Sequence, residues 1–154
     1  MMRWTMMATM AAGLVAAPAG AREAGKVLMP ENAEARAFQE AVGYADAVIA
    51  GDTIYLSGVV AAPAGEDAAG LDAGYDRAFR TIAATLARAG ASWDDVVDIT
   101  TFHTDLAAHI EGFAAVKNKY VKAPFPAWTA IGVSRLYEPT AVVEIKVVAR
   151  RLAK

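Results

Sequence analysis

The chain has 154 residues, the usual size of a single domain, and 56% of them are hydrophobic. Its 15 basic and 17 acidic residues are interspersed and give a formal net charge of -2, so the sequence carries no basic region of the kind that binds nucleic acid or an anionic membrane surface. It contains no cysteine, which excludes disulfides, thiolate nucleophiles and cysteine metal sites.

The first 21 residues have the pattern of a secretory signal peptide. Arg3 supplies a positive charge, an apolar run covers residues 4–15, and residues 19–21 read Ala-Gly-Ala, an A-x-A cleavage site. A membrane anchor and an apolar N-terminal helix are the alternatives, but the run is shorter than the ~20 residues that span a bilayer. We therefore expect cleavage before Arg22 and a periplasmic or secreted protein.

The segment that would follow the cleavage site, residues 22–43, is polar and rich in alanine. It carries a turn at Pro30 and the composition of a short helix that reaches Phe38. The remainder shows no internal linker. We therefore expect an N-terminal extension over residues 22–43 and one domain over residues 44–154.

Short β-rich runs and two helical patterns fill this domain. Two of the runs flank the pair Gly51-Asp52 and predict a hairpin. Leu71–Ala89 has apolar residues at helical spacing and ends before Gly90, and a second helical pattern begins at Asp105. The predicted strands are Ala45–Ala50, Thr53–Val60, Val96–Thr104, Trp128–Val133 and Ala141–Val148, with a loop over Ala61–Gly70.

The predicted order of elements is β-β-α-β-α-β-β, without internal repeats. Helices interspersed among short strands favour an α+β fold in which one sheet carries both helices on one face. The opposite face of that sheet would be apolar, and we expect other copies of the chain to cover it.

Four stretches of the chain resemble the YjgF/Rid family: GDTIYLSG (51–58), RAGASWDDVVDITTFHTDL (88–106), PAWTAIGVSRL (126–136) and VVEIKVVAR (142–150). They occur in the family's order and spacing. The resemblance implies a chorismate-mutase-like α+β fold and a homotrimer with three ligand clefts between subunits. It also implies hydrolysis of reactive enamines and imines to ketones with release of ammonia, without a cofactor.

The resemblance further suggests site residues, one position at a time. Tyr44 stands at the family's tyrosine position ahead of the first strand. Ser57 and Gly58 match the serine and glycine that line the cleft at a strand end. Tyr120 matches an aromatic residue of the second helix, and Glu144 matches the glutamate that positions the hydrolytic water.

Trp128 marks the largest departure from the family pattern. Archetypal deaminases carry an arginine here, which grips the substrate carboxylate through two hydrogen bonds. Because tryptophan cannot neutralise a carboxylate, we expect a non-archetypal substrate that lies against Trp128 and its neighbour Thr129. Lys117, where deaminating members carry asparagine, could return a positive charge. Trp128 could equally be a core or interface residue, and Lys117 a solvated helix residue.

Glu144 invites a chemical interpretation without any family name. Strand alternation places it on the same face as Lys146, within the apolar run VVEIKVV. Burial of a carboxylate in such a strand costs free energy unless the group is paired or has a catalytic role. It could orient water or act as a general base. The alternatives are an ion pair with Lys146 and a partner across an interface.

Other catalytic classes receive little support. His103 and His109 do not have a strong metal-ligand spacing, and a closed site would need a further ligand, so we expect no metal. Ser57 lacks a nearby His-Asp arrangement that would make it a nucleophile. The aromatic residues are not interleaved with basic ones, and we expect no nucleic-acid partner.

Two functions remain open. The first is a Rid-type hydrolase in which Glu144 and backbone groups activate water on an imine, an enamine or a related small molecule. The alternative is a non-catalytic exported trimer that binds a small metabolite or a partner. In both cases the expected partners are a small molecule at subunit interfaces and further copies of the chain, with no membrane attachment after signal cleavage.

Overall fold

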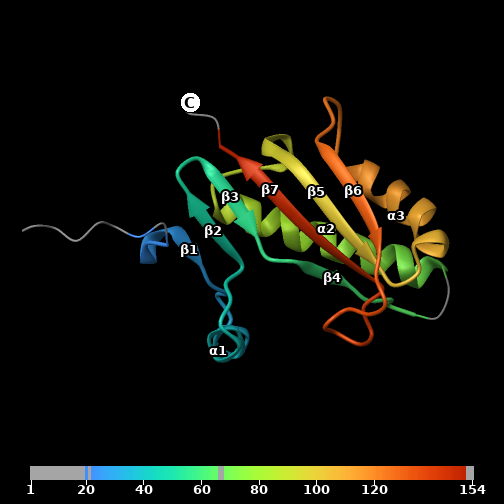
Figure 1. Ribbon diagram of the computed structural model, residues 1–154, viewed down its shortest axis with the longest axis horizontal. Helices are drawn as coiled ribbons and strands as arrows, with labels where there is room; N and C mark the ends of the chain where they lie inside the picture. Colours follow the sequence, from blue (N-terminus) through green and yellow to red (C-terminus); the bar gives the residue numbers. More distant parts are fainter. Residues whose placement is uncertain (1–19, 21, 66–67, 152–154) are drawn as a thin grey trace, which may run out of the picture.

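The computed structural model describes residues 20, 22–65 and 68–151, so nearly all of the predicted signal peptide lies outside it. The described chain folds into a mixed seven-stranded sheet accompanied by helices (Figure 1). The elements are β1 (Val27–Leu28), α1 (Ala33–Val42), β2 (Ala47–Ala50), β3 (Thr53–Leu56), β4 (Val59–Ala61), α2 (Ala68–Arg88), β5 (Val96–His103), α3 (Leu106–Tyr120), β6 (Ala127–Gly132) and β7 (Val143–Arg150), with short 3-10 helices at Ala24–Lys26 and Trp93–Asp95.

The strands follow the order β1-β2-β3-β7-β5-β6, and β4 pairs with β7 beyond the end of β3. Only β5 and β6 are parallel among the described pairs. β3 and β4 pair with successive parts of β7 and are separated by Ser57 and Gly58. The predicted strand Thr53–Val60 is therefore two strands, and the break between them faces the centre of β7.

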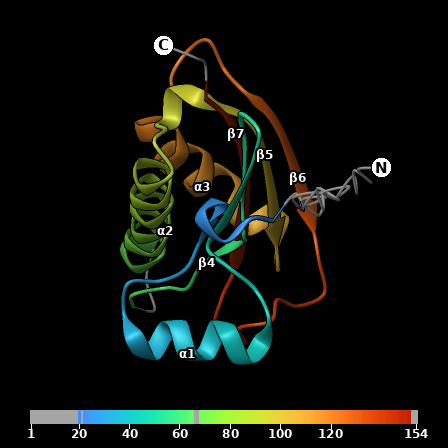
Figure 2. The same cartoon turned by 90° about the vertical axis from the view of Figure 1, so that its left-hand side faces the viewer.

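The two long helices pack on one face of the sheet (Figure 2). Alternate residues of β7 point toward them, and Val143, Ile145 and Val147 are fully buried there. The apolar face of α2 contributes Phe79 and Ile82, as its helical spacing predicted. The α+β architecture with one sheet and two helices on one face is thus confirmed.

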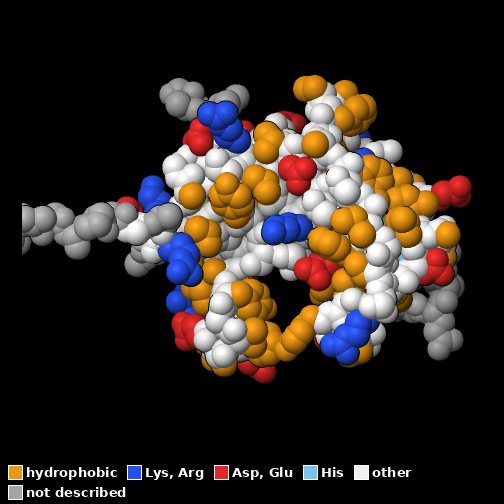
Figure 3. Space-filling model, in the orientation of Figure 1, with side chains coloured by type: hydrophobic (Ala, Val, Ile, Leu, Met, Phe, Trp, Pro, Cys, Tyr) orange, Lys and Arg blue, Asp and Glu red, His pale blue; other side chains and the backbone are white. Residues whose placement is uncertain are grey.

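The opposite face of the sheet is not covered by any helix of the described chain (Figure 2). It exposes large apolar side chains, including Tyr55, Val60 and Ile131. Figure 3 shows hydrophobic side chains on this face among scattered charged ones. We call this surface the open face. Such exposed apolar area is typical of a surface that meets another protein.

Helix α1 crosses the end of the sheet (Figure 2). Its N-cap Asn32 accepts a hydrogen bond from the Ala35 N–H, and Gly43 ends it with a left-handed φ of 89°. The helix therefore extends to Val42, beyond the Phe38 end that we expected, because a residue suited to the left-handed conformation first occurs at Gly43.

Several strand ends differ from the predicted ones by one or two residues, as in β7, which covers Val143–Arg150 rather than Ala141–Val148. The starts of the two long helices also differ. α2 begins at Ala68 rather than Leu71, so the end of the expected loop is helical. Asp105 is the N-cap of α3 and accepts from the Ala108 N–H, so the helix itself begins at Leu106. No helix in the described part of the chain is long and apolar enough to cross a membrane.

Candidate functional site

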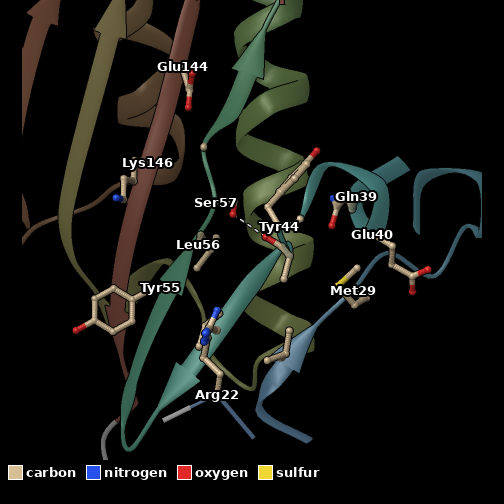
Figure 4. Close-up of a pocket in the computed structure, with 15 residues that line it drawn as sticks. Arg22, Met29, Gln39, Glu40, Tyr44, Tyr55, Leu56, Ser57, Glu144 and Lys146 are labelled. Carbon is tan, nitrogen blue, oxygen red and sulfur yellow. Dashed lines mark hydrogen bonds between the residues drawn. The ribbon is translucent and has the colours of Figure 1, made fainter. Parts of the chain in front are cut away.

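A cleft of ≈ 810 Å³ lies between the open face and α1, where Figure 3 shows the surface hollowed. Its size is typical of small-molecule sites. The walls come from α1, the β2–β3 hairpin, the break between β3 and β4, and the middle of β7 (Figure 4). Four of the residues that we predicted at the site line this cleft together: Tyr44, Ser57, Gly58 and Glu144.

Glu144 lies near the middle of the sheet, opposite Val60 of β4 and Phe102 of β5. Its neighbours on β7 point to the buried helix side, so its carboxylate points to the open face. None of the four ion pairs of the described chain includes it, and no hydrogen bond to it is formed there. The pair with Lys146 that we considered is therefore not formed, and the carboxylate is free to contact a ligand.

Gly58 lies against this carboxylate. A Cβ atom on Gly58 would be 1.8 Å from Glu144 Oε1 and 2.7 Å from Cδ. The absence of a side chain at Gly58 therefore creates the space that the carboxylate occupies.

Ser57 and Tyr44 form the adjoining wall. The Ser57 hydroxyl donates to the Ala45 carbonyl at 2.6 Å, and its backbone N–H donates to the Asp46 carbonyl at 2.9 Å. Because the Ser57 hydroxyl donates its proton to Ala45, its oxygen can accept a hydrogen bond from a ligand. Tyr44 is 41% exposed, and its ring meets that of Phe38 edge to face, with centroids 6.5 Å apart. It offers an apolar surface beside these polar groups.

Our sequence analysis missed a polar support beneath this wall. Asp46 accepts from Gln39 Nε2 through one oxygen and from Arg88 Nη1 through the other, both at 2.8 Å. These bonds fix α1 and α2 to the hairpin that carries Ser57. Gln39 is the buried residue of α1 and lines the cleft. The signal in the sequence would have been Gln39 itself, a polar residue on the side of α1 that otherwise carries apolar residues.

Lys117 and Trp128 lie close to each other, but outside the Glu144 cleft of this chain. The register pairs Trp128 with Ile99, a buried residue on the helix side, so the indole lies on the face opposite to Glu144. Its Nε1–H donates to Thr101 Oγ1 at 3.1 Å, and Lys117 Nζ lies 4.7 Å from the ring centroid. Both residues line a separate hollow of ≈ 240 Å³.

The remaining predicted residues are also outside the cleft of this chain. Tyr120 lies between α3 and α2, where its hydroxyl donates to Asp76 and its ring stacks on Phe79 at 5.2 Å. Burial and the Asp76 carboxylate raise the pKa of its phenol. Thr129 is exposed on the edge strand β6.

The two histidines are close, with ring centroids 6.3 Å apart. His103 is fully buried, and its Nε2 lies 3.0 Å from Thr101 Oγ1. Burial, and then the nearby His109, lower the pKa of His103, so the fold favours the neutral form of this side chain more than the unfolded chain does. Within the described ranges, no cluster of three or more histidine, cysteine or carboxylate side chains could hold a metal ion.

Comparison with known proteins connects this site to a family. The model of the family "Endoribonuclease L-PSP" matches residues 34–151. The chain is 39% identical over 109 residues to the RutC family protein YjgH of Escherichia coli, covering 70% of this chain and 82% of that protein. The chain belongs to the YjgF/Rid family.

Solved structures agree with this assignment. The structure of protein YjgH has a TM-score of 0.69 at 31% identity and covers 88% of this chain and 100% of its own. Rv2704 from Mycobacterium tuberculosis, a member of the YjgF family, has a TM-score of 0.68 at 26% identity and covers 81% and 98%. RidA from Psychrobacter has 0.61 at 25% and covers 86% and 100%. The chorismate-mutase-like fold is confirmed for this YjgF/Rid protein.

Proposed function

We propose that this YjgF/Rid protein is a small-molecule hydrolase that cleaves a C=N bond in the cleft beside Glu144. The proposal is carried by one observation: the Glu144 carboxylate lies in the cleft without an internal partner, in space that Gly58 leaves open. A carboxylate held in this way, on an otherwise apolar strand, is suited to accept a proton from water.

The reaction would proceed by addition of water to the imine carbon. Glu144 accepts one proton of the water as its oxygen forms the C–O bond, and the C=N electron pair moves to nitrogen. That proton then passes from Glu144 to the nitrogen and gives a carbinolamine. The proton of its hydroxyl group is next transferred to the nitrogen, the C–N bond breaks, and ammonia leaves as the C=O bond of the ketone forms. The Ser57 oxygen, whose own proton is bonded to Ala45, can accept from the substrate N–H during these steps.

The cleft favours a substrate with an apolar or aromatic part. Tyr44 and Tyr55 present ring surfaces along its walls, while Arg22 and Lys146 supply positive charge at exposed positions. Because both side chains are exposed, the positive charge that they offer is screened by solvent, and it is weaker than the buried two-bond grip of an arginine. Imines with and without a carboxylate are therefore both candidate substrates.

We expect the protein to act as a homotrimer, the assembly that the family resemblance implies. Two features support such an assembly: the exposed apolar side chains of the open face, and the outer edge of β6, which pairs with no other strand of the described residues. In it, Trp128, Thr129 and Lys117 of one copy could lie against the Glu144 cleft of the next. Light scattering coupled to gel filtration would measure the mass, and a monomer at micromolar concentration would contradict this expectation.

Ammonia release from freshly generated imines tests the function. We expect the protein without residues 1–21 to release ammonia from at least one imine, and the Glu144→Gln variant to lose about two to four decades of that rate. Saturable ligand binding without ammonia release from either substrate class would instead support the non-catalytic binding protein. Export through the predicted signal peptide remains a proposal, and N-terminal sequencing of the secreted protein would test it.

A further inference from the structure

Gln39 places an unpaired hydrogen-bond acceptor at the wall of the Glu144 cleft. The residue is 8% exposed and is the buried residue of α1, yet it lines the cleft. In Figure 4 its side chain extends from α1 toward Tyr44. Its Oε1 atom is buried and has no hydrogen-bond partner among the described residues. A buried carbonyl oxygen without a partner costs free energy, and a donor group on a bound ligand would remove that cost.

The orientation of the Gln39 amide is fixed by a charged network. The Asp46 carboxylate accepts from Gln39 Nε2 through Oδ1 and from Arg88 Nη1 through Oδ2, both at 2.8 Å. A carboxylate paired with a guanidinium only accepts hydrogen bonds, so it binds the NH2 end of the amide and not the oxygen. Arg88 also donates to the Met29 carbonyl, which holds the guanidinium in place. The oxygen that Gln39 turns away from Asp46 is therefore an acceptor with a defined position.

A chain of contacts connects this acceptor to the proposed catalytic carboxylate along one wall of the cleft. Gly58 lies against Glu144, and the preceding Ser57 donates its backbone N–H to the Asp46 carbonyl. The side chain of the same Asp46 binds Gln39. Ser57 Oγ, whose proton is donated to a backbone carbonyl, is a further acceptor in this wall. The wall thus presents three acceptors, from Glu144, Ser57 and Gln39, and it favours a ligand that carries more than one donor group.

We propose that Gln39 is a specificity-determining residue of the Glu144 cleft, and that it selects a substrate whose apolar or aromatic body ends in an N–H or O–H donor. The proposal rests on the hydrolysis proposed above: the C=N group lies at Glu144, and the donor binds Gln39 Oε1 further along the same wall. Apolar parts of the lining, which include Val48 and the ring of Tyr44, accommodate the body.

The selection acts against ligands without a donor at this end. A methyl group there leaves the Gln39 oxygen buried and unpaired. A carboxylate or another pure acceptor faces that oxygen without a hydrogen atom between them, which is worse still. A site built to pair with a donor discriminates strongly against the analogue that lacks it, because its own polar group then stays unsatisfied.

Binding of stable ketones, the class of product of the proposed reaction, tests this selection without turnover. The probes are benzylacetone derivatives whose ring carries, at the para or the meta position, an amino group, a methyl group of similar size or a cyano group. The amino group is a donor, the methyl group is neither donor nor acceptor, and the cyano group is an acceptor. Isothermal titration calorimetry gives each Kd. We expect at least one amino compound to bind about fivefold or more tightly than its methyl counterpart, the ratio for one additional hydrogen bond.

Asp46→Asn provides a readout that depends on the orientation of the Gln39 amide. Arg88 still requires an acceptor, so the new amide would turn its oxygen to Arg88 and its NH2 group to Gln39. Gln39 would then rotate and present its own NH2 group to the ligand. The preference should reverse from the amino to the cyano compound, whereas general damage to the cleft would weaken all compounds alike.

Further variants separate the selection from the chemistry. Gln39→Met removes the acceptor at similar side-chain length, and the affinity ratio of amino to methyl compounds should fall to about one. Glu40→Met is the matched control, because the neighbouring Glu40 also lines the cleft but is exposed, and the ratio should not change. Glu144→Gln should lose ammonia release and keep the ratio, so the two proposals can fail separately.

Two results would overturn the role of Gln39. One is equal affinity of the amino and methyl compounds for the wild-type protein at both ring positions. The other is a preference for the amino compound that persists unchanged in Gln39→Met.

Discussion

Gly58 and Glu144 occupy space that only one side chain can fill: a Cβ on Gly58 would lie 1.8 Å from the Glu144 carboxylate oxygen. The two residues come from different strands, and the break between β3 and β4 places Gly58 opposite the middle of β7. The position of the carboxylate in the cleft therefore depends on a residue that has no functional group of its own.

Substitution of Gly58 by alanine should consequently displace the carboxylate and leave the fold intact, because the obstructed atoms are at the end of a flexible side chain. We expect kcat/KM for ammonia release to fall by about one to two decades, since a reacting group displaced by about 1 Å costs that much. The melting temperature should change little. Gly25→Ala is the matched control, because a Cβ there meets nothing within 4 Å. Full activity in Gly58→Ala would show that the position of Glu144 is not critical.

The bond between Trp128 and Thr101 should contribute measurably to stability, because Thr101 is fully buried and its hydroxyl accepts from the indole N–H at 3.1 Å. We expect a double-mutant cycle with Trp128→Phe and Thr101→Val to give a coupling energy of about 1 kcal/mol. Urea denaturation provides the four free energies of unfolding. Additive effects of the two substitutions would mean that the indole does not make this bond in solution.

His103 should make the protein less stable as the pH falls. Burial lowers the pKa of His103 in the fold, whereas the unfolded chain binds a proton at the usual pKa of about 6.5, so protonation favours unfolding. The free energy of unfolding should therefore decrease as the pH is lowered through about 6.5, by at most about 1.4 kcal/mol per pH unit from this group.

The titration of carboxylates also affects stability at acid pH, so the readout is the difference between two proteins. Wild type and His103→Gln are denatured with urea at about pH 7.5 and about pH 5.5, on either side of the histidine pKa. Wild type should lose more stability between the two pH values. Equal losses would show that His103 takes up its proton without unfolding.

Tyr120 offers a test of a residue that the family resemblance placed at the ligand site. Its hydroxyl bonds to Asp76 and its ring stacks on Phe79, away from the Glu144 cleft of its own chain. Tyr120→Phe should lower the free energy of unfolding by about 1–2 kcal/mol, the range for a hydrogen bond to a charged group at a partly exposed position. KM for the imine should stay within about twofold of wild type. A large rise in KM with unchanged stability would support the substrate-binding role instead.

Local patterns in the sequence were sufficient for much of this fold. The spacing of Tyr75, Phe79, Ile82 and Leu86 predicted α2. Gly90 predicted that the helix ends just before it, and its φ of 77° is the left-handed conformation that glycine adopts readily. The β-branched run after Val96 predicted β5. The four family-like motifs predicted the fold that the comparisons confirmed.

Local pattern did not decide the interruption at Ser57 and Gly58, because a glycine within a β-rich run is compatible with a bulge, a bend or a close backbone approach inside one strand as well as with a break between two. The pairing of β3 and β4 with successive parts of β7 creates the break. The support of Ser57 by Asp46, Gln39 and Arg88 likewise joins residues from three elements, and no local pattern reports such a contact.

The positions of Glu144 and Trp128 show most clearly what the sequence determined and what the tertiary structure decided. Alternation within a strand follows from backbone geometry, so the sequence by itself determined which residues share a face with Glu144 in β7 and with Trp128 in β6. Alternation does not say which face of one strand corresponds to which face of another. The tertiary structure decided that through register, which pairs Trp128 with buried Ile99 and Glu144 with Phe102 on the other face. Hydrogen bonds between strands therefore separated the predicted site residues into a cleft at Glu144 and a hollow at Lys117.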